Sequence, residues 1–104
     1  MASMGKIARL NLEQLGRVAA QQVAGADAVE NVEVSSGEDW SGRPIYQFAF
    51  LIDQARARQR AGVIRIRLIQ ALLDALIARG DEHLPSVQIL SRADWDRRNG
   101  ARPH

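Results

Sequence analysis

The chain has 104 residues, of which 46% are hydrophobic and 25% charged, and this is the size and composition of one folded domain. It contains no cysteine, which excludes disulfide bridges, thiol nucleophiles, thiolate zinc sites and cysteine-bound iron–sulfur clusters. The formal net charge is only +2, and the pI of about 9.9 is high because thirteen of the fourteen basic residues are arginines. The composition therefore predicts a small domain without covalent cross-links and without a strong net charge.

No apolar run approaches the roughly 18 residues that a membrane-spanning helix needs. The N-terminus has one lysine but no apolar segment of the kind found in signal peptides. We therefore expect a cytoplasmic protein with no membrane partner. Residues 1–10 are predicted to be a flexible N-terminus, introduced in part for expression. Residues 11–99 are predicted to form a single α+β domain and residues 100–104 a C-terminal tail.

The first predicted element is an amphipathic helix over residues 12–24. Asn11 is placed to cap the start of this helix, and Gly25 is placed to end it. Apolar residues recur at spacings of three and four and predict one buried side, made of Leu12, Leu15, Val18, Ala19 and Val23.

Two strands follow, joined by a turn-forming segment over residues 36–44. Residues 29–35 alternate between apolar and polar side chains, which is typical of a strand with one buried face. Residues 45–52 carry apolar side chains on both faces, with Tyr46, Phe48 and Phe50 on one and Ile45 and Leu51 on the other. A strand that is apolar on both faces is expected at the centre of a sheet.

A long second helical segment is predicted from Asp53, at the N-cap position, to Arg79, with Gly80 ending it. Gly62 interrupts the helical pattern, so we expect a regular helix only from about residue 62, and the sequence leaves open whether residues 54–62 are helical or loop. Six apolar residues predict the side that faces the core, namely Ile66, Ile69, Leu72, Leu73, Leu76 and Ile77.

Residues 86–90 are predicted to form a third strand. Ser91 and Asp94 then indicate the start of a short helix that ends near residues 99–100, with Trp95 as its anchor on the core. The predicted fold is a two-layer α+β sandwich with a three-stranded mixed sheet and both main helices on one face. The other face of this sheet would stay open and present an apolar row to a partner.

Charge is distributed unevenly along the chain. Residues 18–42 hold five acidic and no basic residues, whereas residues 54–73 hold five arginines and no acidic residue. These arginines could contact the phosphates of a nucleic acid. Alternatively, they form a solvated helix start whose charges pair with the acidic hairpin or with a second subunit. We favour this interpretation because helical spacing would place two of them nearly opposite the other three. We call them the arginine stretch: Arg56, Arg58, Arg60, Arg65 and Arg67.

The predicted hairpin turn contains Trp40 and, close by, Arg43. A tryptophan at a hairpin tip can anchor a protein partner or stack on a nucleic-acid base. The alternative is that Trp40 folds back over the edge of the sheet, and this is the interpretation that we favour.

The sequence contains few residues suited to catalysis. The two histidines, His83 and His104, are too few for a three-histidine metal site within one chain. We expect His83 to be a polar residue of the connector before the third strand. The Gly-x-Ser-x-Gly, Walker and Gly-x-Gly-x-x-Gly motifs are absent. We therefore predict no catalytic site, no metal and no cofactor, and a protein that is not an enzyme.

With this order of elements, residues 12–95 resemble the topology of the type II KH and BolA-like families. Arg65-Ile66-Arg67 is similar to the Arg-His-Arg helix of BolA proteins, and His83 falls where that family has its histidine before the last strand. Ile66 stands where the family has the central histidine, and the Gly-x-x-Gly clamp of KH domains is absent. The BolA resemblance implies a glutaredoxin partner that shares an iron–sulfur cluster through histidine, for which only His83 could serve.

The chain is also similar to a small, uncharacterised bacterial family with a Trp-x-Gly-x-Pro hairpin, here residues 40–44, and a Gly-Asp-x-x-x-Pro turn, here residues 80–85. The genes of this family lie beside those of toxin-like proteins. The resemblance favours a non-enzymatic protein-interaction module, antitoxin-like or otherwise regulatory, that forms a homodimer or binds a protein partner. Its binding residues would be Trp40, Arg43 and the arginine stretch. The alternative is a KH-like module that binds nucleic acid through the arginine stretch.

Overall fold

The computed structural model describes the backbone of residues 4–100 and the side chains of residues 11–99. Within these residues, no helix combines the length and the apolar character needed to cross a membrane. The elements follow the predicted order and comprise α1 (Met4–Ala24), the 3-10 turn η1 (Ala26–Ala28), β1 (Val29–Glu38), β2 (Pro44–Ile52), α2 (Ala61–Ala78), β3 (Leu84–Leu90) and α3 (Arg92–Gly100).

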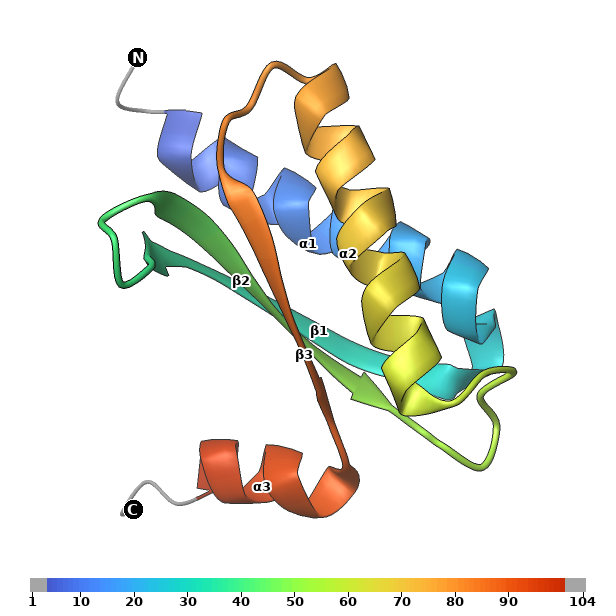
Figure 1. Cartoon of the computed structure of the whole chain (residues 1–104). Coiled ribbons are helices and arrows are strands. Elements are labelled where there is room, and N and C mark those ends of the chain that lie inside the picture. Colours follow the sequence, from blue (N-terminus) through green and yellow to red (C-terminus); the bar gives the residue numbers. More distant parts are fainter. Residues whose placement is uncertain (1–3, 101–104) are drawn as a thin grey trace.

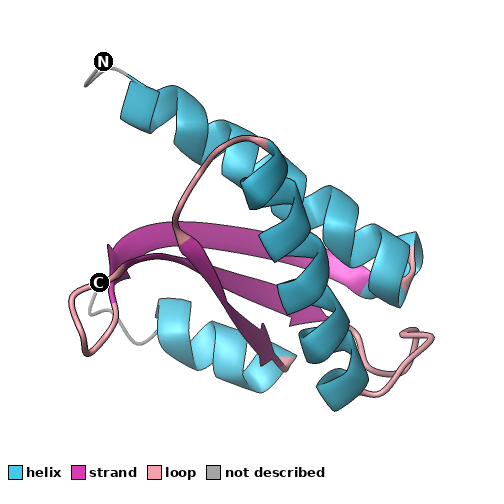
Figure 2. Ribbon diagram, turned by 45° about the horizontal axis from the view of Figure 1, so that its top comes forward, coloured by secondary structure: helices cyan, strands magenta, loops and turns pink. Residues whose placement is uncertain are grey.

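The three strands form one mixed sheet in the order β1-β2-β3. β1 pairs with β2 in the antiparallel direction, and β2 pairs with β3 in the parallel direction. α1 and α2 lie side by side on one face of the sheet, whereas α3 lies under the other face (Figures 1 and 2). The predicted α+β class, the mixed sheet, the central position of β2 and the placement of both main helices on one face are confirmed.

The main core lies between the sheet and the two long helices. β2 contributes Phe48, Phe50 and Ile52 to it, each at most 2% exposed. Their register partners on β1 and β3 include Val34 and Val87, which are buried on the same face. Alternation along β2 therefore produces this core face, as the sequence pattern predicts.

The side of α2 that faces this core differs from the prediction. The fully buried row is Ile64, Leu68, Leu72 and Leu76, with a spacing of four residues. Ile66 and Ile77, which were expected in the core, are 65% and 63% exposed. The prediction failed because α2 is apolar on two sides, so periodicity alone cannot show which side packs on the sheet.

α1 begins at Met4, so Asn11 lies inside the helix and does not cap it. The helix extends into the segment 1–10 that was predicted to be flexible, and residues 1–3 lie outside the described residues. Propensity explains the extension, because residues 5–10 include lysine, alanine, arginine and leucine and no proline. The predicted stop at Gly25 is confirmed, since its φ of 99° ends the helix.

The buried side of α1 includes a row of small residues. Gly16, Ala20 and Ala24 follow a spacing of four and are buried, whereas Val18, which was expected on this side, is 41% exposed. A Cβ added to Gly16 would lie 3.0 Å from Cδ2 of Phe48. The helix backbone therefore approaches the sheet more closely than a row of leucines would permit.

Asp53 does not cap the second long helix, contrary to the prediction. Its carboxylate accepts a hydrogen bond from the N–H of Ala55 at 3.0 Å, and its carbonyl accepts from the N–H groups of Arg56 and Ala57. These bonds form a tight turn within the loop of residues 53–60. α2 begins only at Ala61, which confirms the expected regular helix from about residue 62.

The far face of the sheet does not present the predicted apolar row. α3 covers one end of this face, where Trp95 packs on Ala49, Leu51 and Leu90 in a second, smaller core. The predicted anchoring role of Trp95 is confirmed. So is the start of α3, where the hydroxyl of Ser91 accepts a hydrogen bond from the N–H of Asp94 at 3.2 Å. Of the predicted C-terminal tail, residues 101–104 lie outside the described residues.

We expect opposite effects from adding one methyl group at two helical glycines. Gly16→Ala should lower the free energy of unfolding by about 1 kcal/mol, because overpacking against Phe48 outweighs the gain in helix propensity. Gly62→Ala should raise it by about 0.5–1 kcal/mol, because nothing lies within 4 Å of the added Cβ. Urea unfolding of both variants measures the two changes. Stabilisation by Gly16→Ala would contradict the close packing of α1 on the sheet.

Candidate functional site

The turn between β1 and β2, residues 39–43, is held in one conformation by Asp39; we call it the hairpin tip. One carboxylate oxygen, Oδ1, accepts hydrogen bonds from the N–H of Ser41 at 2.8 Å, from its hydroxyl at 2.7 Å and from the N–H of Arg43 at 2.9 Å. The backbone N–H of Asp39 donates to the carbonyl of Arg43 at 2.9 Å. The hydroxyl of Ser41, followed by the N–H of Arg43, lowers the pKa of Asp39 below its usual value.

Trp40 stands at this tip and is 98% exposed. The favoured prediction, that it folds back over the sheet, is therefore wrong. The reason lies in the turn, because the bonds to Asp39 and the positive φ of 85° at Gly42 fix the backbone so that the indole points away from the sheet. Arg43 is exposed on the same turn. The hairpin tip thus presents a large apolar side chain and a cation on one turn, three residues apart.

Tyr46, Asp81 and His83 form a polar cluster where β2 and β3 begin. The hydroxyl of Tyr46 donates to Oδ2 of Asp81 at 2.7 Å. Oδ1 of Asp81 accepts from the backbone N–H of His83 at 2.9 Å and lies 2.7 Å from Nδ1 of its ring. The rings of Tyr46 and His83 are stacked, with centroids 4.0 Å apart. The cluster therefore ties the start of β2, close to the hairpin tip, to the connector after α2.

The surroundings of this cluster shift two pKa values. Burial, and then the bond to the carboxylate of Asp81, raise the pKa of Tyr46 to about 12. Burial alone would raise the pKa of Asp81, but the hydrogen bonds from His83 and Tyr46 outweigh it and hold that pKa below its usual value. Asp81 is therefore a stable carboxylate acceptor and Tyr46 a stable hydroxyl donor at neutral pH.

This cluster was not predicted from the sequence, although the spacing of Asp81 and His83 is a recognisable signal. The spacing of Asp81 and His83 is that of an aspartate that accepts a hydrogen bond from the N–H two residues later. His83 does lie in the connector, as expected. The contribution of Tyr46 depends on the parallel register, in which Tyr46 pairs with Pro85, and the sequence does not specify this register.

The arginine stretch does not form one continuous surface. Nε of Arg65 donates to the carbonyl of Val87 at 3.0 Å, so this side chain lies along β3. Arg56 lies 3.6 Å from the carboxylate of Asp53 and is well exposed. The side chain of Arg58 lies against the backbone of Gly25. Each of these three arginines therefore lies against a different part of the chain.

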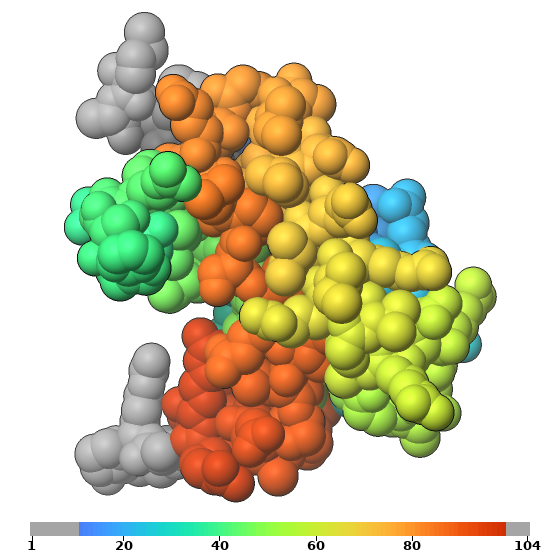
Figure 3. All heavy atoms as spheres, viewed as in Figure 1, coloured from blue at the N-terminus to red at the C-terminus, as the bar shows by residue number. Residues whose placement is uncertain are grey.

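The hairpin tip and the loop of residues 53–60 lie at opposite ends of the sheet (Figure 1). They are separated by the nine residues of β2, a span of roughly 25–30 Å. The surface view agrees, with the green hairpin and the yellow-green loop projecting at opposite sides (Figure 3). Trp40 and Arg43 are thus brought together, but not with Arg56, Arg58 and Arg60.

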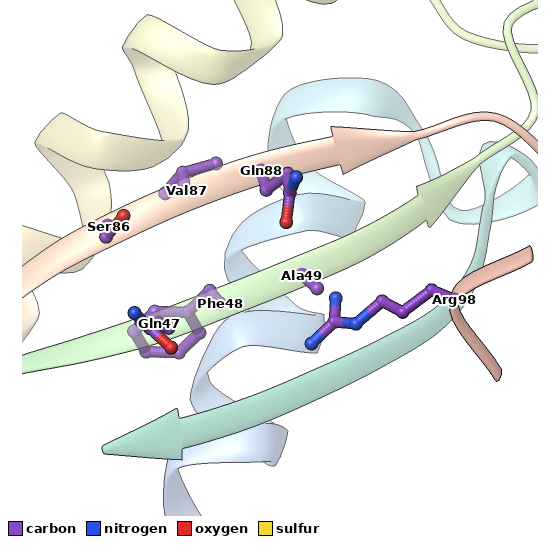
Figure 4. A pocket seen from close by; sticks show the side chains of 7 residues that line it. All are labelled: Gln47, Phe48, Ala49, Ser86, Val87, Gln88 and Arg98. Atoms are coloured by element: carbon purple, nitrogen blue, oxygen red, sulfur yellow. The ribbon is translucent and has the colours of Figure 1, made fainter. Parts of the chain in front are cut away.

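A shallow hollow of about 370 Å³ lies on the far face of the sheet, beside α3 (Figure 4). Its lining is largely polar, and Arg98 of α3 reaches over it while lying 3.7 Å from the carboxylate of Glu33. The other lining residues are Gln47, Phe48, Ala49, Ser86, Val87 and Gln88. Within residues 4–100, no group of three or more histidine, aspartate or glutamate side chains is placed to hold a metal ion.

Comparisons with protein-family models, with curated proteins and with solved structures found no match for this chain.

Stability at alkaline pH should depend on Tyr46. A pKa raised from 10.0 to about 12 stabilises the fold fully below pH 10, and this contribution is lost as the pH rises toward 12. Tyr46→Phe should reduce the loss of stability between these pH values by about 1–2 kcal/mol. Because the chain has a single tyrosine, tyrosinate absorbance measures this pKa directly. A midpoint near 10 would contradict the bond to Asp81.

Asp81→Ala should lower the free energy of unfolding at pH 7 by about 2–3 kcal/mol, because it removes a charged acceptor of several hydrogen bonds. The lowered pKa of Asp81 means that its contribution is present above pH 3.8 and is lost as the pH falls below that value. The difference from the unaltered chain should therefore shrink in acid. Glu82→Ala, at the exposed neighbouring position, is the matched control and should have little effect.

Proposed function

We propose that this chain is a non-enzymatic protein-interaction module that binds a protein partner through its hairpin tip. One observation carries the proposal, namely that Trp40 is 98% exposed on a turn whose backbone is fixed by Asp39. Tryptophan is among the residues most often found as energetic anchors of protein interfaces, and it is rarely left fully in water.

The rigidity of the hairpin favours binding. Ordering a loop on association costs free energy, and a turn that is already ordered avoids this cost. Hydrogen bonds to Asp39 fix the tip, and the bond from Tyr46 to Asp81 holds the start of β2 close to the tip. The backbone that carries the indole is therefore ordered before a partner arrives.

The hairpin tip also indicates what the partner offers. An indole needs an apolar pocket, whose walls replace water around its ring. Arg43 on the same turn would pair with a carboxylate at the rim of that pocket. A small regulatory or antitoxin-like subunit that docks on a second protein is the form of this function that the sequence resemblance favours.

Binding of nucleic acid through the arginine stretch is the second candidate function, and three of its arginines lie on one loop. These are Arg56, Arg58 and Arg60, at the end of the sheet opposite Trp40. The engagement of Arg65 with the backbone of β3 favours the first candidate, because it removes one cation from a common surface. The two candidates use opposite ends of the molecule, so one set of variants separates them.

Trp40→Ala should reduce partner binding at least about 30-fold, which corresponds to an anchor worth about 2 kcal/mol. Proteins are first captured from a lysate of the native host on the tagged full chain. Each captured protein is then purified, and its affinity for the unaltered chain and for the variant is measured. Val18→Ala alters an exposed apolar residue on α1 and is the matched control, which should bind like the unaltered chain. In a Trp95→Phe variant, Trp40 is the remaining tryptophan, and its fluorescence should shift to shorter wavelength on binding.

Two results would overturn the proposal. One is a captured protein that binds the Trp40→Ala variant as tightly as the unaltered chain. The other is binding of labelled single-stranded RNA or duplex DNA that weakens steeply with salt and is lost in an Arg56/Arg58/Arg60 triple-alanine variant. The latter would establish the nucleic-acid function in its place.

A further inference from the structure

α2 carries a second apolar row on the side that points away from the sheet. Five of its positions follow the alternating three-and-four spacing of helices that pack in pairs, and at 100° per residue they fall within an arc of about 80°. This arc is nearly opposite the buried row of Ile64, Leu68, Leu72 and Leu76. We call these five positions the outer stripe: Val63, Ile66, Gln70, Leu73 and Ile77.

The outer stripe is open to solvent. Ile66 and Ile77 are 65% and 63% exposed, Val63 is 38% exposed, and Leu73 is half-buried. α2 lies across the front of the molecule, where its yellow-to-orange surface is uncovered (Figure 3). Single exposed apolar residues are ordinary, but a row of them along one helix marks a contact surface.

Charges beside the stripe indicate what covers it. Arg67 and Asp74 lie on the same flank of the stripe, seven residues apart, and both are exposed. Seven residues span about 10 Å along a helix, which is too far for an ion pair within α2. Within the described part of the chain, neither residue forms an ion pair. One cation and one anion on the same flank make the surface complementary to itself when a second copy is turned end for end.

We propose that the outer stripe binds the outer stripe of a second copy of this chain, with the two α2 helices antiparallel. A twofold axis between positions 71 and 72 places Ile66 level with Ile77 of the second copy, and Gln70 level with its Leu73. Arg67 then lies within about 3 Å, along the helix axis, of the level of Asp74 of the second copy, and the symmetry generates this pair twice.

The antiparallel arrangement follows from the same charges. In a parallel pair the twofold axis runs along the helices, so the flank with Arg67 and Asp74 of one copy lies across the seam from the same flank of the second copy, and these charges stay apart. In an antiparallel pair the two flanks lie on the same side of the seam, where Arg67 of each copy can attract Asp74 of the other. Antiparallel pairing also brings the two Gln70 amides near the axis, where a polar residue in an apolar seam sets the register of the helices. This surface does not include Trp40, so dimerisation and binding of a different partner at the hairpin tip are independent.

Sedimentation equilibrium of the full chain over a range of concentrations tests the proposal. The mass should rise from 11.5 kDa toward twice that value. Arg67→Asp and Asp74→Arg should each weaken the dimer about tenfold or more, because each places two like charges together twice. The double variant Arg67→Asp/Asp74→Arg should restore the dimer, because the exchange recreates both ion pairs. Val18→Ser, on α1, is the control and should dimerise like the unaltered chain.

Cysteine pairing tests the orientation, since the chain has no cysteine of its own. A mixture of Ile66→Cys and Ile77→Cys chains should form a disulfide-linked heterodimer under mild oxidation, and neither variant alone should link to itself. Circular dichroism of each variant at low concentration establishes that it folds. The proposal is overturned by a monomer at the highest concentration, by linkage of Ile66→Cys chains to each other, or by a double charge variant that stays as weak as the single ones.

Discussion

Burial of β2 on both faces is the constraint on which the rest of the fold depends. Phe48 and Phe50 need a cover on one face, and Leu51 needs one on the other, so a single layer of helices cannot satisfy this strand. α1 and α2 cover the first face, and Trp95 of α3 covers the end of the second. Helices therefore cover both faces of β2 near Leu51, and the exposed loops lie before and after the strand.

The two ends of β2 therefore have different properties. At its start, Asp39 fixes the hairpin tip, and the cluster of Tyr46, Asp81 and His83 ties the first residues of β2 to the connector after α2. At its end, the loop of residues 53–60 carries three exposed arginines. A rigid tip favours a partner with a complementary pocket, because little free energy is lost in ordering the turn on binding. A cationic loop favours long-range attraction, which acts on association rate more than on specificity.

The close approach of α1 to the sheet explains how two helices pack on one face of a three-stranded sheet. Gly16 lets the α1 backbone lie near Phe48, while α2 packs through larger side chains such as Leu68. The inner side of α2 is thus buried against the sheet. Apolar residues on the outer side of α2 stay exposed, and these are the residues that we propose pair with a second copy of the chain.

The order of the elements and the central position of β2 could be predicted from the sequence, because local propensity and the two-residue alternation of apolar side chains act along the chain. The bounds of α1 and α2 could not. Local turn-forming residues also predicted that Trp40 and Arg43 lie on one turn. Tertiary structure alone decided which side of α2 is buried, since Ile66 and Leu68 are equally apolar and only the sheet distinguishes them. It also decided that Trp40 points into solvent and that Tyr46 meets Asp81, because hydrogen-bond geometry and strand register join residues that the sequence keeps apart.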